Sequence, residues 1–232
     1  DVTCFGIQNA TALVSVSGGT LPYQYVWSNG QTSANISNLS AGNYAVTVED
    51  TNGCKSTANT VVEAPAPLQI LLSTVELLCF GTSDASISAV VSGGNQQYSY
   101  QWSNGGNSNN INQLGAGTYT LTVTDQKGCT LEETVTLQQP LPITITSEKT
   151  DPGCFGAADG RITLKVEGGQ QPYRYSRDQG PFGGSPTFIG LKSGVYQFVV
   201  RDANGCTGSL TDSLEQPLPV GVSLGPDTTI FL

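Results

Sequence analysis

The fold is decided by residues 39–54, which read LSAGNYAVTVEDTNGC. Tyr44, Val46 and Val48 alternate with small or polar residues, which is typical of a β-strand with one buried face. The segment DTNGC at 50–54 follows this strand, and Asp and Asn-Gly favour tight turns. No segment carries apolar residues at helical spacing for three turns, so the sequence predicts an all-β protein.

The same pattern recurs at residues 114–129 and 191–206, inside a larger repeat of about 75 residues. Each copy begins with Cys-Phe-Gly and continues through a Gly pair and a Tyr-x-Tyr. These landmarks start at Cys4, Cys79 and Cys154, at Gly18, Gly93 and Gly168, and at Tyr23, Tyr98 and Tyr173. We therefore expect three domains, at 1–64 (without a leading strand), 65–139 and 140–216. Residues 217–232 would be a linker and spare strand, or the start of a further module.

Six or seven short strands per copy, separated by frequent turns, indicate an immunoglobulin-like β-sandwich. Trp27 and Trp102 occupy the place of a core Trp on the third strand. Tyr44, Tyr119 and Tyr196 each follow a Gly before a late strand, as in a tyrosine corner, where the hydroxyl bonds the backbone near the preceding Leu. The third copy departs from the motif at Ser176 and lacks the Trp, so we expect a weaker core there. Three such modules in tandem predict an elongated rod.

The cysteines suggest disulfides and therefore an oxidising compartment. Pairing within each copy is the simplest expectation, since the repeat then selects one of fifteen connectivities. The expected bonds are Cys4–Cys54, Cys79–Cys129 and Cys154–Cys206. Six reduced thiols are an alternative, whereas a zinc site is disfavoured because the chain has no His and no close Cys pair. We expect a bond between copies, or one core shared by the whole chain, to contradict the modular interpretation.

Composition excludes several functions. The net charge is −9, with nine scattered Lys and Arg, so no basic surface for nucleic acid is expected. No apolar run is long enough to span a membrane. The chain lacks His, the usual base for a Ser or Cys nucleophile, and Glu132 and Glu133 are neighbours that face opposite ways on a strand. We predict no enzyme activity and no cofactor.

The ordered motifs Cys-Phe-Gly, Gly-Gly, Tyr-x-Tyr-x-Trp-Ser-Asn-Gly, Leu-x-Ala-Gly-x-Tyr and Val-x-Asp-x-x-Gly-Cys resemble the SprB repeat over nearly the whole chain. That repeat belongs to very large surface adhesins of gliding bacteria and their relatives in the Bacteroidota. The resemblance implies export by the type 9 secretion route, display on the cell surface, and a role in adhesion or gliding. It supplies no catalytic residues.

The ends of the repeat array suggest two interpretations. Copies two and three have a strand ahead of their first Cys, at 68–77 and 143–149, whereas the first copy has only residues 1–3. The chain can be an excerpt of a longer stalk, or its tail can be a strand donated to another subunit, which would make a head-to-tail filament. The donor candidates are Val220, Val222, Leu224, Ile230 and Leu232.

Three weaker hypotheses concern ligands and modification. Asp50, Asp125 and Asp202 precede each Gly-Cys turn and are candidate calcium ligands, although a turn-forming role also explains their spacing. The Tyr-x-Tyr pairs are candidates for a glycan-binding face, as a function other than a stalk, but shared orientation with the Trp residues favours the core. Ser213 and Thr228 follow Asp residues in short segments that resemble an O-glycosylation signal.

Overall fold

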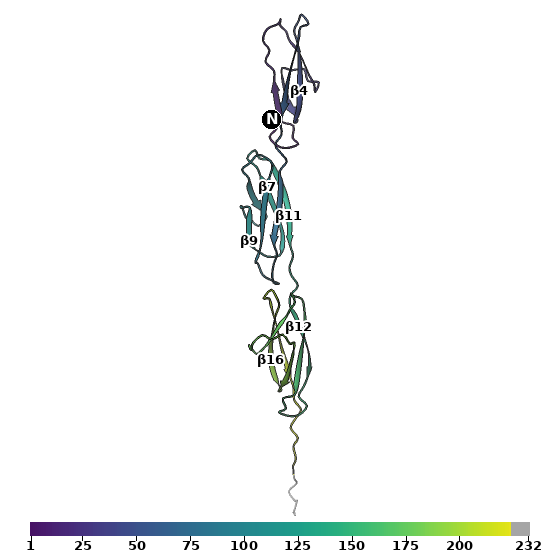
Figure 1. Ribbon diagram of the computed structural model, residues 1–232, viewed down its shortest axis with the longest axis vertical. Coiled ribbons are helices and arrows are strands. Elements are labelled where there is room, and N and C mark those ends of the chain that lie inside the picture. The colour runs from purple at the N-terminus through teal and green to yellow at the C-terminus, as the bar shows by residue number, and fades with distance from the viewer. Residues whose placement is uncertain (224–232) are drawn as a thin grey trace, which may run out of the picture. The chain divides into compact units, whose positions relative to one another are not determined.

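The computed structural model describes residues 1–223, and within them every regular element is a β-strand (Figure 1). The first repeat contains β1 (Ala10–Leu13), β2 (Gln24–Trp27), β3 (Asn35–Leu39), β4 (Gly42–Glu49) and β5 (Lys55–Val62). The second contains β6 (Gln69–Val75), β7 (Ala85–Ser92), β8 (Ser99–Trp102), β9 (Asn110–Leu114), β10 (Gly117–Thr124) and β11 (Thr130–Leu137). The third contains β12 (Thr144–Thr150), β13 (Gly160–Glu167), β14 (Arg174–Arg177), β15 (Thr187–Leu191), β16 (Gly194–Arg201) and β17 (Thr207–Leu214).

Each repeat is a sandwich of two antiparallel sheets. In the second and third repeats both sheets have three strands, in the orders β6-β7-β9 with β8-β10-β11, and β12-β13-β15 with β14-β16-β17. In the first repeat the sheet β2-β4-β5 is complete, but the other sheet contains only β1 and β3. In the second repeat β7 lies between β6 and β9, whereas the equivalent strand β1 has a neighbour on one side only, β3. The other edge of β1 pairs with no strand in the described part of the chain.

The first and third repeats each enclose a separate hydrophobic core. In the first, Trp27, Ile36 and Val46 are buried together with other residues that all come from positions 2–62. In the third, Phe198 and Val200 are fully buried in a cluster drawn from positions 162–214. The alternation along the strands supplies these cores, because residues at i and i+2 of a strand face the same side.

The third repeat compensates for its missing Trp with two phenyl rings. Trp27 and Trp102 are the last residues of β2 and β8, and each pairs with a residue of the neighbouring central strand. The residue at the same place in the third repeat is Arg177, which pairs with Phe198. Phe198 is fully buried and its ring centroid lies 5.0 Å from that of Phe188, a distance typical of packed aromatic pairs. Ser176, where we expected a weaker core, is buried and donates a hydrogen bond to the carbonyl of Gly180 at 2.6 Å. The aromatic volume is thus supplied by other strands.

A tyrosine near the start of a central strand (β4, β10 or β16) closes each sandwich. The hydroxyl groups of Tyr44, Tyr119 and Tyr196 donate to the carbonyl oxygens of Ser40, Gly115 and Lys192 at 3.0, 3.0 and 2.8 Å. Each acceptor is the residue directly after the Leu of the repeat motif. These bonds tie the strand to the loop that precedes it, which is the geometry of a tyrosine corner.

The described residues divide into two compact units: residues 1–75 with 86–137, and residues 76–85 with the described residues from 138 onward. These two units do not coincide with the three expected domains, 1–64, 65–139 and 140–216. The segment 76–85 contains the Cys-Phe-Gly loop of the second repeat and belongs with the third repeat. Such a grouping requires strong links between successive repeats.

Candidate functional site

The links between repeats are two disulfides. Cys4 is bonded to Cys129 with Cα atoms 5.7 Å apart, and Cys79 is bonded to Cys206 with Cα atoms 5.5 Å apart. The expected bonds Cys4–Cys54, Cys79–Cys129 and Cys154–Cys206 are therefore wrong. The leading cysteine of one repeat is bonded to the closing cysteine of the next, and Cys54 and Cys154 are in no disulfide.

The length of the sandwich explains why pairing within a copy fails. Cys4 lies beside the start of β4, because the amide of Val2 donates to the carbonyl of Glu63, next to Val62, which pairs with Gly42. Cys54 lies beyond the other end of β4. An eight-residue strand spans about 25 Å, whereas a disulfide requires Cα atoms within about 6.8 Å of each other.

A bond between copies also does not contradict modularity, so that expectation was wrong. With the partly buried residues that pack against it, the core of the first repeat draws on residues 2–64, and that of the third on residues 143–214. The disulfides join surface loops of separately packed sandwiches. The cores of the first and third repeats are thus separate, and a covalent link between repeats is compatible with separate cores.

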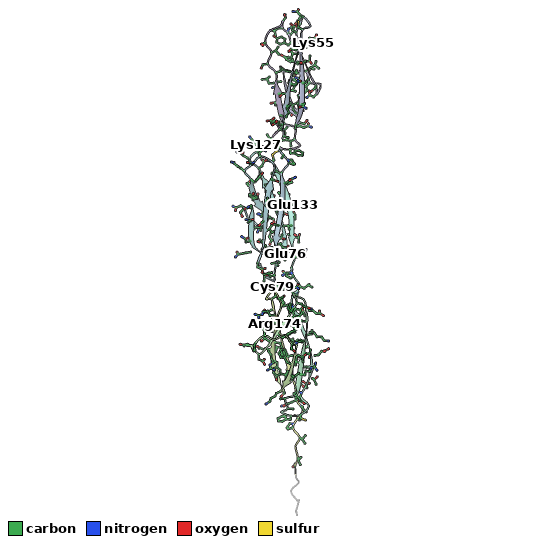
Figure 2. All side chains as sticks on the ribbon, in the orientation of Figure 1. Lys55, Glu76, Cys79, Lys127, Glu133 and Arg174 are labelled. Atoms are coloured by element: carbon green, nitrogen blue, oxygen red, sulfur yellow. A yellow bond between two sulfur atoms is a disulfide. The ribbon has the colours of Figure 1, made fainter. Side chains whose placement is uncertain are left out.

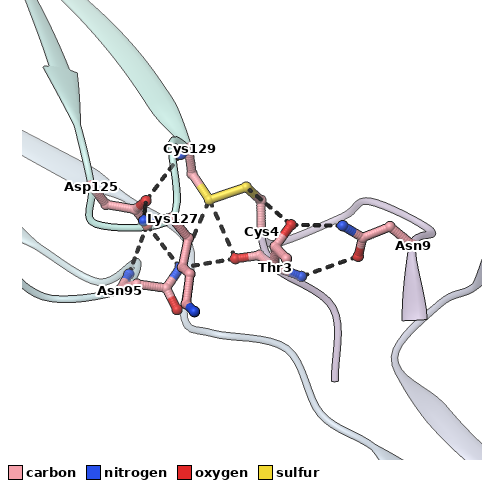
Figure 3. Close-up of a disulfide and its surroundings, with 7 residues drawn as sticks. All are labelled: Thr3, Cys4, Asn9, Asn95, Asp125, Lys127 and Cys129. Atoms are coloured by element: carbon pink, nitrogen blue, oxygen red, sulfur yellow. Dashed lines mark hydrogen bonds between the residues drawn. A yellow bond between two sulfur atoms is a disulfide. The ribbon is translucent and has the colours of Figure 1, made fainter. Parts of the chain in front are cut away.

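Asp125 holds the closing turn that presents Cys129 (Figure 3). Its Oδ1 accepts hydrogen bonds from the backbone amides of Lys127 and Cys129, at 2.8 and 2.9 Å. Its Oδ2 accepts from the backbone amide and the side-chain amide of Asn95, at 2.7 and 2.9 Å. Burial acts to raise the pKa of Asp125, but these donors outweigh it and lower the pKa to about 2.

The same turn recurs in the other two repeats. The backbone amides of Cys54 and Cys206 donate to Oδ1 of Asp50 and Asp202, at 2.9 and 2.8 Å. The hydrogen bond from Cys54, and then one from Thr20, lower the pKa of Asp50. Gly53 in this turn has a φ of 81°, a conformation that favours glycine. The repeated Asp therefore shapes the turn that carries the closing cysteine.

The leading cysteine is presented by a second local structure. In the first repeat, the amide of Ile7 donates to the carbonyl of Cys4. Thr3 and Asn9 exchange two hydrogen bonds of 3.1 and 2.7 Å (Figure 3). Across the junction, the side-chain amide of Asn95 donates to the carbonyl of Thr3 at 2.8 Å. This bond and the disulfide dock the leading loop of one repeat on the closing turn of the next.

The remaining candidate sites are placed as follows. The carboxylates of Asp50, Asp125 and Asp202 are engaged by backbone amides, and the described residues contain no group of three His, Cys, Asp or Glu side chains suited to a metal. Calcium binding therefore rests on the sequence alone. Glu132 and Glu133 are exposed on β11, where Glu132 accepts a hydrogen bond from Thr122.

The aromatic candidates for a glycan face contact the interior of the sandwich. Tyr23 and Tyr25 pack against the core of the first repeat, and Tyr173 and Tyr175 against that of the third. The hydroxyls of Tyr23, Tyr98 and Tyr173 each donate to the first glycine of the Gly pair, at 2.6 Å in all three repeats. In the first and third repeats the rings of Tyr23 and Tyr173 therefore connect the core to the Gly pair.

The tail is only partly described. Val220 and Val222 are exposed and lie outside any strand. Leu224, Ile230, Leu232 and the glycosylation candidate Thr228 lie outside the described residues. Ser213 lies on β17, half-buried, and its carbonyl accepts a hydrogen bond from Lys149 at 2.7 Å. In residues 1–223 no helix has the length and apolarity that crossing a membrane requires.

The sandwiches and their junctions define a class of protein: immunoglobulin-like modules in tandem, each linked to the next by a disulfide. The family model described as the SprB repeat matches this chain three times, at residues 1–32, 71–107 and 146–182. The SprB repeat is therefore detected at three segments of this chain, one in each sandwich. A search of curated proteins found no match.

Solved structures with similar folds are immunoglobulin domain arrays. The eight N-terminal domains of the Down syndrome cell adhesion molecule are 14% identical, with a TM-score of 0.43, over 91% of this chain and 35% of that one. Titin domains I67–I69 are 12% identical, with a TM-score of 0.39, over 91% of this chain and 94% of that one. Sidekick-1 immunoglobulin domains 1–5 are 14% identical, with a TM-score of 0.34, over 90% of this chain and 57% of that one. These are similarities of fold.

Thiol labelling of the monomeric protein tests the two junctions. Without reductant, iodoacetamide should modify Cys54 and Cys154 alone, because only these thiols are free and exposed. After proteolysis, mass spectrometry should find Cys4 joined to Cys129 and Cys79 joined to Cys206. The reduced and unfolded protein, labelled at all six positions, is the control. Recovery of Cys4 joined to Cys54 would contradict the junctions.

The variant D125N tests the closing turn and its pH dependence. The ordinary pKa of 3.8 falls to about 2 in the folded state, so the charged carboxylate stabilises the protein above about pH 4. That contribution is lost as the pH falls from about 4 to about 2. At pH 6, D125N should lower the free energy of unfolding by on the order of 2 kcal/mol in urea titrations, and the difference from wild type should shrink toward pH 2.

The control for D125N is E133Q, which changes the net charge equally on an exposed face of β11. E133Q should alter the free energy of unfolding by less than about 0.5 kcal/mol. A difference between D125N and wild type that stays constant from pH 6 to pH 2 would contradict the role assigned to the carboxylate.

Proposed function

We propose that this chain is a load-bearing structural segment of an extracellular surface adhesin. The family and the immunoglobulin-like fold support a surface structural repeat, and the disulfides are consistent with an oxidising location. Adhesion or gliding, display on a bacterial surface and export by the type 9 route are part of the proposal. Modules of this kind are typically not catalytic, and we propose no enzyme activity.

The covalent path through the junctions carries this proposal. Cys4–Cys129 and Cys79–Cys206 span sequence separations of 125 and 127, and the two closed loops overlap. A pull on the two ends therefore passes from Cys4 to Cys129, along the second repeat to Cys79, and then to Cys206. Most of the first and third repeats lie outside this path. The bonds limit how far the chain can extend even if a sandwich unfolds.

A glycan-binding module is the less favoured function. The tyrosines proposed for such a face pack against the cores and bond the Gly pairs. No specific observation in the described residues favours a saccharide site. The contacts of these tyrosines are instead explained by a structural role, in which they stabilise the sandwich.

Strand exchange between copies is a second candidate function, and the first repeat favours it. Within residues 1–223, β1 pairs with β3 on one side and with no strand on the other, whereas β7 and β13 are flanked on both sides. The tail segment Pro217-Leu-Pro-Val-Gly-Val222 has the pattern of Pro140-Leu-Pro-Ile-Thr-Ile145, which leads into β12. A tail from one copy that pairs with β1 of another would complete the sheet, since an open edge is a template for an added strand.

Single-molecule stretching from the two termini tests the load-bearing proposal. At about 3.5 Å per residue, the fully stretched oxidised chain should reach roughly 280 Å and the reduced chain roughly 810 Å. The matched variant C129S keeps only the second junction and should reach roughly 360 Å. Equal lengths with and without reductant would contradict the shortened path.

Light scattering of the protein in reductant tests strand exchange separately. The intact chain should form concentration-dependent oligomers, and deletion of 217–232 should abolish them, because the donated strand is lost. The substitution V195D, at an exposed valine of β16, is the control and should leave oligomers unchanged. A monomer at all concentrations would contradict strand exchange and leave the load-bearing proposal intact.

A further inference from the structure

The third repeat carries most of the positive charge of this acidic chain. Residues 140–216 contain seven of the nine Lys and Arg residues, and all four arginines are among them. Two of these arginines, Arg174 and Arg201, lie opposite each other on neighbouring strands. We propose that they form a binding site for an oxyanion with two negative charges, such as inorganic sulfate or a phosphate monoester, on the outer face of the sheet β14-β16-β17.

The register of the sheet places the two arginines side by side. Arg174 is the first residue of β14 and pairs with Arg201, the last residue of β16. Their neighbours Tyr175 and Val200 pack in the core, and successive residues of a strand face opposite sides, so both arginines face solvent. Residues directly opposite on an antiparallel pair have Cβ atoms about 5 Å apart, and like charges at this distance destabilise the sheet.

The other two repeats have no charge pair of this kind. At the same register, Gln24 pairs with Glu49 in the first repeat and Ser99 pairs with Thr124 in the second. These residues also stand at the first position of β2 and β8 and the last position of β4 and β10. The sandwich therefore forms without two arginines at these positions, and the pair is particular to the third repeat.

Neither arginine has an ionic partner among residues 1–223, where the ion pairs involve other Lys and Arg side chains. Asp202 follows Arg201 in sequence, but it is buried and its carboxylate is engaged by the backbone. Its Oδ1 accepts from the amide of Cys206 at 2.8 Å, and its Oδ2 accepts from the amide of Gln170 at 2.9 Å. Although the chain has 18 acidic residues against nine basic ones, the two guanidinium groups are left for an external anion.

A longer loop in the third repeat holds the guanidinium group of Arg201. The loop between β14 and β15 covers residues 178–186, two residues more than the loops at 28–34 and 103–109. Its Gly183 forms an antiparallel bridge with Tyr175 through two backbone hydrogen bonds of 2.8 Å. The ring centroid of the adjacent Phe182 lies 4.4 Å from Cζ of Arg201, a cation–π contact. This contact restricts the side chain before an anion binds and so reduces the entropy lost on binding.

A hollow beside the two arginines gives an anion access to both. It has a volume of about 390 Å³ and is lined by Pro172, Arg174, Arg201 and the turn at 202–205. Arg174 lies on the third repeat, where it is exposed (Figure 2). Guanidinium groups bind oxyanions through paired N–H donors. Two such groups match a ligand with two negative charges, whereas a single carboxylate would neutralise only one of them.

A titration of the full chain with sodium sulfate, followed by NMR, tests this site. The ionic strength is held constant by exchange against sodium chloride, because this removes the effect of general screening. The Nε–H signals of Arg174 and Arg201 should shift and saturate with sulfate, and chloride alone should not move them. The Nε–H signal of Arg161, whose Nε donates to Thr163 on β13, should stay in place.

Two variants that copy the other repeats separate the site from the fold. R174Q introduces the residue type of Gln24, and R201T introduces that of Thr124, so both changes are compatible with the sandwich. Each should weaken sulfate binding by about tenfold, because one charge-assisted contact is lost. The matched control R161Q removes the same charge at an exposed position of β13 and should bind sulfate as wild type does.

Each outcome decides for or against the site. No saturable shift in wild type, or an equal loss of affinity in R161Q and R174Q, would overturn it, and the load-bearing proposal would be unaffected. Sedimentation with phosphatidylcholine vesicles, with and without phosphatidic acid, identifies the source of the anion. Binding to the phosphatidic acid vesicles alone supports the site with a lipid headgroup as its ligand, whereas sulfate binding without co-sedimentation supports the site with a soluble oxyanion.

Discussion

The reach of a disulfide, set against the length of a β-sandwich, governs this protein. Eight-residue central strands place the leading and closing cysteines of one copy about 25 Å apart, far beyond the separation that a sulfur–sulfur bond allows. Each cysteine can therefore be satisfied only by another repeat. An array of such modules is linked from each copy to the next, and any finite array has one unbonded closing cysteine and one unbonded leading cysteine.

The closing turn makes that link possible because the carboxylate of its Asp accepts hydrogen bonds that fix the shape of the turn. Asp125 receives four donors from three residues, and these orient the amide of Cys129 and hold Asn95 beside the junction. A cation at this position would compete with the same amides for the same oxygens. The spacing of Asp and Cys thus follows from the turn. The pKa of Asp125 is low because hydrogen bonds from backbone amides and from the side chain of Asn95 outweigh the effect of burial.

Periodicity in the sequence was sufficient to predict the strands, the three SprB-like segments and the class of fold, because alternation and turn residues act over a few positions. The repeat period did not predict the disulfide pairing. Every copy has a closing Cys at the same place in the motif, so the period does not tell whether Cys4 bonds to the closing Cys of its own copy or of the next. A usable signal was nevertheless present. The run from Gly42 to Glu49 is too long a strand for cysteines at its two ends to meet. The contact of Asn95 with Thr3 had no such signal, because Thr20 and Gln170 occupy its place in the other copies.

The differences among the three copies show which features the architecture can vary. The core of the third repeat replaces an indole with Phe188 and Phe198, because buried volume can be redistributed among strands that face one interior. The junction offers no such freedom: an Asp, a Gly and a Cys stand at the same places of all three closing turns, and Cys-Phe-Gly opens all three leading loops. A bond between two sulfurs depends on the position of both partners to within a fraction of an ångström. The shared property of these repeats is therefore the way that one is attached to the next, and the sandwich is the spacer that sets the distance between attachments.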